Sequence, residues 1–390
     1  MEKIINKCPV CEETSAKQFF EIKGVPVMVN VPSFTPEEAK NAKRGDITLK
    51  FCQNCGHIFN SVFNPESIEY NEYYENPLHY SSRFKEYNAE LIVRLIKTYN
   101  IQNKKVMDIG GGRGHFLDLL CKEGANDGIC LDPGCGEEQT QKSSGSMTFI
   151  KDFYSQKYRD YKADFICCRQ VLEHIYSPRQ FLDLIHHAIL EKTNSIVFFE
   201  VPNADYVFKD LGIWDLLYEH YSYFNKSSLR YVFEASGFGV CNLFEAYKDQ
   251  YLCIEAKPAI TRIEENNYDT EKIAYSLEGF EEKYQKKIGF WKQKLKDLKR
   301  ANKKIVVWGA GTKGVMFLNM LKIQDEVEYA VDINPNKQGK YIVGTGQEII
   351  APEFLREYRP DAVIIMNSIY KDEITQSLNK LDINTGFLYA

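Results

Sequence analysis

The sequence has no apolar run long enough to cross a membrane. Its 390 residues contain no stretch of about 18 apolar residues, the length that a transmembrane helix needs. The first residues, MEKIINKCPVC, include no apolar segment of the kind that signal peptides carry. We therefore expect a cytoplasmic protein without a membrane partner.

An excess of positive charge is also missing. The formal net charge is −5 at pH 7, which argues against nucleic acid as the main partner. Tandem repeats and low-complexity tracts are absent as well. With 44% hydrophobic and 26% charged residues, the composition is that of an ordinary globular protein. At roughly 100–200 residues per domain, the length predicts two or three domains.

Eleven cysteines without an export signal indicate reduced thiols rather than disulfides. Four of them form two pairs, Cys8-x-x-Cys11 and Cys52-x-x-Cys55. Two such pairs supply the four thiolates that a structural, closed Zn²⁺ site prefers. The alternatives are a redox pair or metal-free thiols, and a redox motif needs no second pair. His57 follows closely, but four cysteines already complete the site.

Strand-like and helix-like segments alternate from 104 to 257, and a second α/β unit begins near 303. The fold class is therefore α/β. Between the two units, apolar residues recur at helical spacing, which predicts one charged amphipathic helix over 270–302 with Tyr275 on its apolar stripe. We interpret that stripe as helix packing.

A glycine-rich turn, VMDIGGGRGHFLDLL, follows the first strand of the central region. Glycines let a backbone approach a ligand closely. A dinucleotide site is one reading of the turn. However, Asp108 before the glycines would repel a pyrophosphate and attract an ammonium, and Asp132 ends the next strand where it can accept bonds from ribose hydroxyls. An ammonium plus a ribose is the pattern of S-adenosylmethionine (SAM). The glycines concerned are Gly110, Gly111, Gly112 and Gly114.

Here the sequence resembles class I methyltransferases. Asp108 with its glycines matches the acid–glycine turn of that family, and Asp132 matches the acid of the second strand. The resemblance implies that Asp152 and Phe153 contact adenine. It also implies that "CCRQVLEHI" flanks the methionine moiety through Gln170, with Glu173 and His174 as further candidates.

Three stretches resemble the sugar C-methyltransferases that act on nucleotide-linked 4-keto-deoxysugars in deoxysugar biosynthesis. They are CPVC…FCQNCGHIFN, FEVPNADYVFKDLGIWDLLYEHYSYFN and GAGTKG…VDINPNKQGKYIVGT…PDAVIIMNSIYKDEI. The resemblance spans nearly the whole chain and implies SAM and Zn²⁺ as cofactors and a nucleotide sugar as the small-molecule substrate. It divides the chain into a zinc-binding domain (1–75), a SAM-dependent methyltransferase domain (76–257), a linking helix (258–302) and a C-terminal Rossmann-like domain (303–390). The oligomeric state stays open.

An acid and an imidazole, Glu219 and His220, stand side by side among aromatic residues. The resemblance assigns His220 as the base that removes a proton beside the ketone, with Glu219 and Tyr218 in support. Aromatic walls would lower the pKa of His220, whereas an adjacent carboxylate that orients the ring would raise it; the sequence leaves the balance open. Asn203 is a candidate donor to the enolate oxygen. From the residues alone, these aromatic side chains and a satisfied buried histidine would read as core.

The family also carries a tyrosine and paired serines before the methyltransferase domain. In "LHYSSRF" the matching residues are Tyr80, Ser81 and Ser82. If the family's tyrosine falls one position earlier, His79 occupies its place. The alternative for this tyrosine-rich run is a packed linker.

The C-terminal unit opens with VVWGAGTKGVMFLNML, a second strand, glycine turn and helix, and Asp332 ends its next strand. The resemblance implies that this domain caps the active site and helps to hold the nucleotide. Lys313 and the helix N-terminus suit a diphosphate; a nicotinamide site, or a solvated lysine, are the alternatives.

Two further functions remain as alternatives at this stage. One is a SAM-dependent O- or N-methyltransferase on the same scaffold, which needs no removable proton on carbon. The other is a non-catalytic module that binds a nucleotide or a partner. The intact Asp108 glycine turn weighs against the second.

Overall fold

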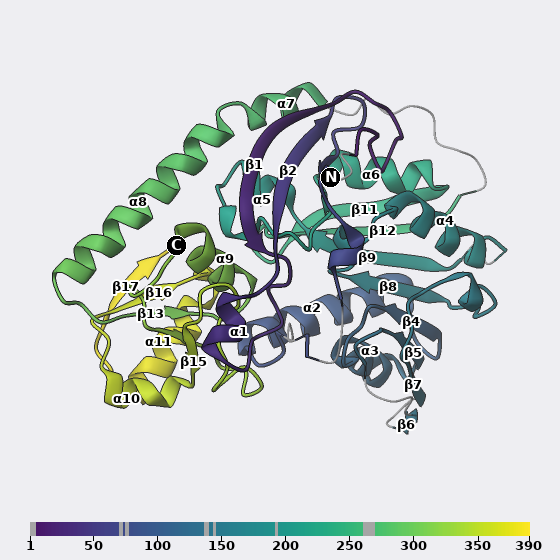
Figure 1. Ribbon diagram of the computed structural model, residues 1–390. Helices are drawn as coiled ribbons and strands as arrows, with labels where there is room; N and C mark the ends of the chain where they lie inside the picture. The colour runs from purple at the N-terminus through teal and green to yellow at the C-terminus, as the bar shows by residue number, and fades with distance from the viewer. Residues whose placement is uncertain are drawn as a thin grey trace.

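The computed structural model describes residues 5–69, 73–74, 78–135, 140–142, 146–191, 194–259 and 270–390. These residues form three β-sheets of four, eight and five strands. In Figure 1 the purple N-terminal strands lie between the blue and teal central region and the yellow C-terminal region, and a long green helix arches along the outside.

The N-terminal sheet has the strand order β1-β2-β3-β10, and its neighbours pair antiparallel. Apolar side chains alternate along β2, where Ile47, Leu49 and Phe51 are buried, as expected for a sheet with one covered face. The last strand, β10, comes from far along the chain, a pairing that no local sequence pattern indicated. The elements are β1 (Ala16–Pro26), α1 (Pro36–Lys40), β2 (Arg44–Cys52), β3 (Ile58–Asn60) and β10 (Ser222–Tyr223).

The central sheet has the order β11-β12-β9-β8-β4-β5-β7-β6. Its five inner strands, from β9 to β7, are parallel and read as short continuous apolar runs because both faces are covered. The strands predicted from the sequence in this region are confirmed. Their bounds are β4 (Lys105–Ile109), β5 (Asp127–Leu131), β6 (Thr140–Lys142), β7 (Ser146–Ile150), β8 (Phe165–Arg169), β9 (Ile196–Pro202), β11 (Phe238–Ala246) and β12 (Tyr251–Pro258).

Helices with well-formed ends accompany the central sheet. Ser81 caps the first of them by accepting a hydrogen bond of 3.3 Å from the Phe84 amide. Asn225 and Ser228 form a reciprocal capping box at the start of the last. The helices are α2 (Ser82–Tyr99), α3 (His115–Gly124), α4 (Pro178–Ile189), α5 (Ala204–Phe208) and α6 (Lys226–Ala235).

The strand order of the central sheet reverses at β4. From β4 the chain continues outward through β5 and β7 on one side, and then returns to β8 and β9 on the other. In open parallel sheets, ligands bind beyond the carboxyl ends of the strands at such a switch point. The Gly110–Gly114 turn and Gln170 follow the two strands that flank it.

The C-terminal sheet is parallel throughout, with the order β15-β14-β13-β16-β17. The expected second Rossmann-like unit is therefore present. Its elements are β13 (Ile305–Trp308), α9 (Thr312–Leu321), β14 (Tyr329–Val331), β15 (Glu348–Ile350), α10 (Leu355–Tyr358), β16 (Ala362–Ile365), α11 (Lys371–Lys380) and β17 (Gly386–Tyr389).

The prediction of one helix over 270–302 is wrong. Two helices occupy this segment, α7 (Thr270–Leu277) and α8 (Phe280–Arg300), and Gly279 between them has a φ of +67°. That left-handed conformation ends the first helix. Tyr275 is 76% exposed and lies off the packed stripe, whose members from Phe280 to Leu295 are buried.

The N-terminal and C-terminal regions are joined by direct contacts. The Arg44 guanidinium donates to the carbonyl oxygens of Gly24 (2.6 Å) and Gly344 (2.7 Å). The Gly344 amide donates in turn to the Ala39 carbonyl over 2.7 Å. Among the helices in the described ranges, none combines the length and apolarity needed to cross a membrane.

Candidate active site

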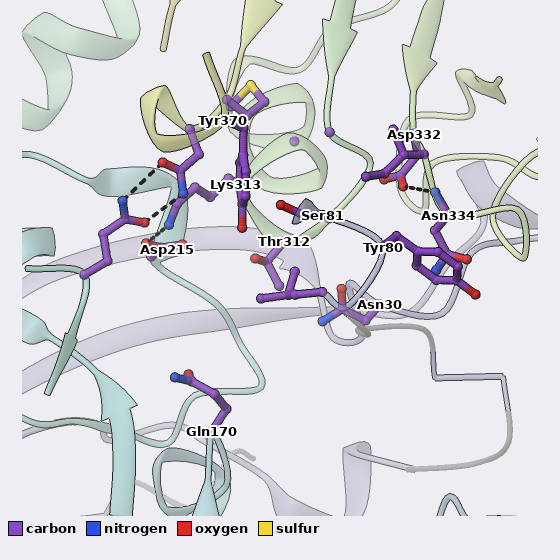
Figure 2. A pocket seen from close by; sticks show the side chains of 18 of the residues that line it. Asn30, Tyr80, Ser81, Gln170, Asp215, Thr312, Lys313, Asp332, Asn334 and Tyr370 are labelled. Carbon is purple, nitrogen blue, oxygen red and sulfur yellow. Dashed lines mark hydrogen bonds and ion pairs between the residues drawn. The ribbon is translucent and has the colours of Figure 1, made fainter. Parts of the chain in front are cut away.

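A cavity of about 240 Å³ lies where the carboxyl ends of central strands face the glycine turn of the C-terminal domain. Figure 2 shows Gln170 on one side of it, and Thr312, Lys313 and Asp332 on the other. The predicted site residues that line it are Tyr80, Ser81, Gln170, His220 and Lys313.

The imidazole of His220 lines this cavity. Its side chain is 7% exposed, and its ring centroid lies 4.9 Å from that of His174. Burial, followed by the neighbouring His174 and Lys313, holds the pKa of His220 well below its usual range. The aromatic and apolar surroundings therefore prevail, and His220 is a neutral imidazole that can accept a proton.

Glu219 does not orient the His220 ring, contrary to our expectation. Its carboxylate accepts hydrogen bonds from the Val29 amide (2.5 Å) and from the Tyr74 hydroxyl (2.9 Å). Both partners come from the N-terminal part of the chain, so adjacent side chains of this segment point into different surroundings. Burial raises the pKa of Glu219 to about 7.

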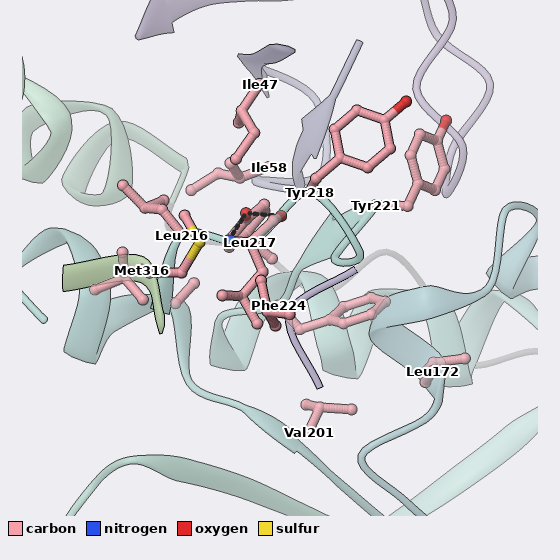
Figure 3. Close-up of a cluster of buried hydrophobic side chains, with 14 of the residues drawn as sticks. Ile47, Ile58, Leu172, Val201, Leu216, Leu217, Tyr218, Tyr221, Phe224 and Met316 are labelled. Carbon is pink, nitrogen blue, oxygen red and sulfur yellow. Dashed lines mark hydrogen bonds between the residues drawn. The ribbon is translucent and has the colours of Figure 1, made fainter. Parts of the chain in front are cut away.

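Tyr218 also lies outside the cavity lining. Its ring packs so closely over Gly45 that a Cβ there would lie 2.3 Å from a ring carbon, and its hydroxyl accepts a hydrogen bond of 3.1 Å from the Asn64 amide. Figure 3 shows Tyr218 among buried apolar side chains that include Ile47 and Leu217. The structure therefore supports the simpler alternative from the sequence, that Tyr218 is a residue of the hydrophobic core.

Glu173 and His174 accompany His220 in the cavity wall. Nδ1 of His174 lies 2.9 Å from the Glu219 carbonyl oxygen. A carbonyl only accepts, so Nδ1 carries the proton and Nε2 is left as an acceptor. Within the described residues, Oε2 of Glu173 is buried without a hydrogen-bond partner, and burial raises the pKa of this carboxyl to about 8. One ligand-type atom from each residue of this trio lies within 4.8 Å of the others, a spacing that would also suit a metal ion.

Tyr80 and Ser81, rather than His79, face the cavity. The His79 ring lies against His115, with 3.7 Å between centroids. Ser81 donates a hydrogen bond of 2.7 Å to the Glu373 carboxylate of the C-terminal domain. Ser82 is exposed, lies outside the lining, and contacts the same carboxylate through its backbone amide.

The glycine turn after β4 has the backbone that only glycine adopts without strain. The φ angles of Gly110, Gly112 and Gly114 are +72°, +56° and +73°. Asp108 lies beneath the turn, 2% exposed, and burial raises the pKa of its carboxyl to about 6. A Cβ at Gly111 would lie 2.5 Å from the Asp108 carboxylate, so the turn and the acid pack against each other.

The two remaining acids proposed for SAM end their strands as expected. Asp132 accepts a hydrogen bond of 2.8 Å from the Gly112 amide, which ties the second strand to the turn. Asp152 accepts one of 2.6 Å from the Tyr158 hydroxyl, and this bond lowers the pKa of Asp152. Phe153 is 61% exposed and leaves an aromatic face open beside them.

Gln170 is held by a buried ion pair. Its own φ is +56°, a strained value for glutamine, and its backbone amide donates to the Glu200 carbonyl over 2.7 Å. The Glu200 carboxylate accepts from the Gln170 side chain (3.2 Å) and from the Arg169 guanidinium (2.9 Å). The local rule that glutamine avoids a positive φ is broken at a cavity residue, as is common at functional sites.

Asn203 does not serve as a donor to the cavity. Its side chain caps α5 by accepting from the Asp205 amide (3.0 Å) and donates to the Asp249 carbonyl (2.8 Å). The amide oxygen and one of the two N–H groups are therefore used in the fold, and Asn203 is not among the residues that line the cavity, so the structure does not support this expectation.

On the C-terminal side, Lys313 forms an ion pair with Asp215 across the cavity. Asp332 accepts hydrogen bonds of 2.8 Å each from the amides of Ala310 and Asn334. Asp132 accepts from two amides in the same way, those of Gly112 (2.8 Å) and Gly134 (2.6 Å), so the two strand-end acids are held alike.

Sequence reasoning missed the residues that join the methyltransferase and C-terminal domains beside the cavity. Gln250 and Asn367 exchange side-chain hydrogen bonds of 3.1 and 2.9 Å, and the hydroxyls of Tyr247 and Tyr370 lie 2.8 Å apart. Asn367 and Tyr370 lie in the PDAVIIMNSIYKDEI stretch that carries the family resemblance, but no sequence pattern pairs them with Gln250 and Tyr247. Only the packing of the two domains brings them together.

The four predicted metal ligands converge at the N-terminal end. The sulfur atoms of Cys8 and Cys55 lie 3.6 Å apart, and those of Cys11 and Cys52 lie 3.5 Å apart. All four lie within 4.8 Å of one another. Tetrahedral metal–sulfur bonds of about 2.3 Å place sulfurs roughly 3.8 Å apart, so the four thiols fit one tetrahedral ion. His57 points elsewhere, toward the Ser222 hydroxyl at 3.2 Å.

Comparisons with known proteins agree with this geometry. Residues 80–243 match the model of a methyltransferase domain, and residues 254–389 match that of the C-methyltransferase C-terminal domain. The C-methyltransferase NovU of Streptomyces niveus is 24% identical over 298 residues, 72% of this chain and 70% of that protein.

Two solved structures resemble part of the chain. A putative methyltransferase in complex with the Haloferax volcanii Trm112 activator is 12% identical, with a TM-score of 0.34 over 47% of this chain and 99% of the other. The dimethyltransferase RosA of Streptomyces davawensis is 18% identical, with a TM-score of 0.35 over 45% of this chain and 55% of the other.

The match over 80–243 and the strand order of the central sheet define the class: this is a class I SAM-dependent methyltransferase. The second matched domain narrows the class. The two matched domains and the similarity to a C-methyltransferase support a SAM-dependent C-methyltransferase, and the resemblance to the sugar C-methyltransferase family is confirmed at that level.

Proposed function

We propose that this C-methyltransferase methylates the carbon beside the ketone of a nucleotide-linked 4-keto-deoxysugar. The observation that carries the proposal is the position of His220. This imidazole lies in a cavity between the methyltransferase strands and the glycine turn at the start of α9. In the proposal, this imidazole acts as the base between a wall that binds SAM and a wall that binds a nucleotide diphosphate.

Carbon becomes a nucleophile here only after it loses a proton. A ketone on the neighbouring carbon makes that loss easier, since the charge then moves to oxygen as an enolate. His220 is unprotonated in the resting cavity because burial lowers its pKa. As the proton moves, the negative charge that develops on the substrate favours the imidazolium beside it.

Tyr80 takes the role first assigned to Asn203. Its side chain lines the cavity together with His220, and a phenol can donate a hydrogen bond to the enolate oxygen. His174, whose Nδ1 proton is held by the Glu219 carbonyl, fixes one face of the His220 ring. Glu219 therefore acts through its backbone and its anchoring to Val29, and Tyr218 acts through packing.

SAM, when bound, supplies a methyl group on a sulfonium that the carbon nucleophile can attack in line. The chain's own contribution is to hold that group near the cavity. Asp132 suits the ribose hydroxyls, Asp152 and Phe153 suit the adenine, and Gln170 lies where the SAM crevice meets the cavity. Such positioning accounts for much of the rate of a two-substrate reaction.

Lys313 and the N-terminus of α9 suit the diphosphate of the substrate. The lysine is held by Asp215 at the cavity wall, so its ammonium is already placed. Ser81 lines the cavity from the opposite segment, where its hydroxyl donates to Glu373 and accepts from the Phe84 amide. For the four cysteines we propose a structural zinc ion, which fits the reduced thiols of a cytoplasmic protein.

The test is mass spectrometry of products after incubation with SAM and a panel of nucleotide-linked 4-keto-deoxysugars. We expect one added methyl, with fragmentation placing it on a ring carbon next to the ketone. A methyl on a hydroxyl or amine instead would overturn the proposed chemistry. No methyl on any member of the panel would overturn the proposed substrate class.

A further inference from the structure

The second cysteine pair, Cys52 and Cys55, comes directly before strand β3. This strand pairs with β10, which follows the segment that carries His220. Cys52 and Cys55 form a turn in which the Gly56 amide donates to the Cys52 carbonyl over 3.0 Å. The Cys52 amide donates to the His57 carbonyl over 2.8 Å. Strand β3 begins at the next residue, Ile58, so the geometry of the Cys52–Cys55 turn sets where the strand starts. We call this turn, together with the Cys8–Cys11 pair, the cysteine knuckle.

Strand β3 holds β10 through backbone and side-chain bonds. Phe59 pairs with Ser222 in an antiparallel register, and the Asn60 amide donates to the Tyr221 carbonyl over 2.9 Å. The His57 ring nitrogen Nε2 lies 3.2 Å from the Ser222 hydroxyl. These residues are all buried, so few waters can replace the bonds if they break.

Strand β10 closes the loop that carries His220. The Tyr223 hydroxyl accepts from the Leu217 amide (3.1 Å) and donates to the Leu217 carbonyl (2.9 Å). The His220 amide donates to the same carbonyl over 3.3 Å. The base therefore lies inside a short loop whose two ends are fastened by one residue of β10.

We infer that the cysteine knuckle is a positioning element of the active site: a metal held there fixes β3, β3 fixes β10, and β10 fixes the loop of His220. The inference rests on the proposed metal and on the proposed role of His220. It departs from the view of a zinc module that only folds its own domain.

The strands that carry the proposed SAM site do not depend on β3 or β10. They pair with one another, β4 with β5 and β8, through complete parallel ladders. A change at the knuckle should therefore disturb His220 while leaving the crevice formed. That difference makes the inference testable.

The first experiment compares the full-length protein before and after removal of zinc with a chelator, using hydrogen–deuterium exchange and calorimetric binding of S-adenosylhomocysteine. We expect amide exchange to rise at least tenfold in a peptide covering 217–223, with little change in β4 and a dissociation constant within about twofold. Unchanged exchange over 217–223 would overturn the inference. Loss of S-adenosylhomocysteine binding would overturn it too, because the metal would then support the whole fold.

The second experiment uses Ser222→Ala, which removes the contact with His57 while keeping the cysteines. Ser195→Ala is the matched control, since it deletes a buried serine hydrogen bond of 2.8 Å to Ala163 elsewhere in the fold. We expect kcat to fall several-fold in Ser222→Ala with the KM for SAM unchanged, and faster amide exchange over 217–223. Equal behaviour of the two variants in both readouts would contradict the inference. The exchange readout needs no substrate, so failure of the proposed sugar chemistry would be recognised separately.

Discussion

Two glycine turns of similar sequence differ in what they face. Each follows a parallel strand, opens a helix, and is tied to an acid at the end of the next strand: Asp132 accepts from Gly112, and Asp332 accepts from Ala310. The central turn lies over the buried Asp108. The C-terminal turn instead lines the cavity that contains His220.

The difference shows that a glycine turn identifies a ligand only through its surroundings. Both turns suit a ligand that approaches the backbone, but the methyltransferase model matches the region around the first and the C-methyltransferase model matches the region around the second. Our proposal gives the central turn to SAM and the C-terminal turn to the nucleotide sugar. The predictions below separate these two assignments.

The largest expected effect comes from placing a Cβ in the central glycine turn or in the first turn of α9, which follows the C-terminal glycine turn. In Gly110→Ala the added carbon would lie 2.2 Å from a Val171 methyl, at a φ of +72°. In Gly314→Ala it would lie 1.8 Å from the Gly309 carbonyl oxygen. Isothermal titration should show SAM binding weakened at least tenfold in the first alone, and nucleotide-sugar binding weakened at least tenfold in the second alone.

Gly289→Ala is the control for this pair, because nothing lies within 4 Å of the added carbon in α8. It should raise stability by about 0.5–1 kcal/mol and change neither affinity. If both turn variants lost the same ligand, the division of roles would be wrong.

Lys313 offers the next largest effect. Lys313→Met keeps the length of the side chain but removes the charge that faces the proposed diphosphate. We expect the KM for the nucleotide sugar to rise about tenfold, equivalent to about 1.4 kcal/mol, with the SAM affinity unchanged. Steady-state kinetics with each substrate varied in turn would measure this. A fall in kcat at constant KM would instead place Lys313 in the chemical step.

A smaller effect should appear in the pH dependence of stability. The pKa of Glu173 is raised from 4.5 to about 8 by burial, so the folded state holds its proton more tightly than the unfolded state. This contribution is complete below pH 4.5 and disappears as the pH rises through 8. Between pH 7 and 8 the free energy of unfolding should fall by about 1 kcal/mol.

Glu173→Gln should flatten this slope, because the amide has no proton to lose. Denaturant titrations at pH 7 and 8 would measure both proteins. An unchanged slope in the variant would mean that Glu173 is already ionised in the folded protein, as it would be beside a bound metal ion.

The smallest effect is expected at Phe153. The ring is 61% exposed, so Phe153→Ala should leave the unfolding temperature nearly unchanged. Loss of stacking on adenine should weaken SAM binding several-fold, and nucleotide-sugar binding should stay the same. An unaltered SAM affinity would remove Phe153 from the adenine site.

The sequence was sufficient for the two α/β units, for the strands of the central unit apart from β6, and for the cysteine cluster. These features depend on local patterns: apolar runs, glycine turns and ligand pairs. The break at Gly279 was missed because the apolar periodicity continues through it, and the left-handed φ that ends α7 leaves no trace in that pattern.

The site was predicted less completely, since its geometry depends on contacts between distant segments. His220, Tyr80 and Gln170 reach the cavity as expected. Glu219 and Tyr218 do not, because the N-terminal region supplies hydrogen-bond partners that turn their side chains away. The pairing of β10 with β3 could not be read from two residues of strand.

The central claim is that His220 removes a proton from carbon before any methyl group moves. Its direct test is incubation of the wild type and His220→Ala in D₂O with a nucleotide-linked 4-keto-deoxysugar that the wild type methylates, in the presence of S-adenosylhomocysteine in place of SAM. We expect the wild type to exchange the hydrogen beside the ketone, and the variant to exchange it at least 100-fold more slowly while binding S-adenosylhomocysteine equally well. Equal exchange rates in the two proteins would contradict the account.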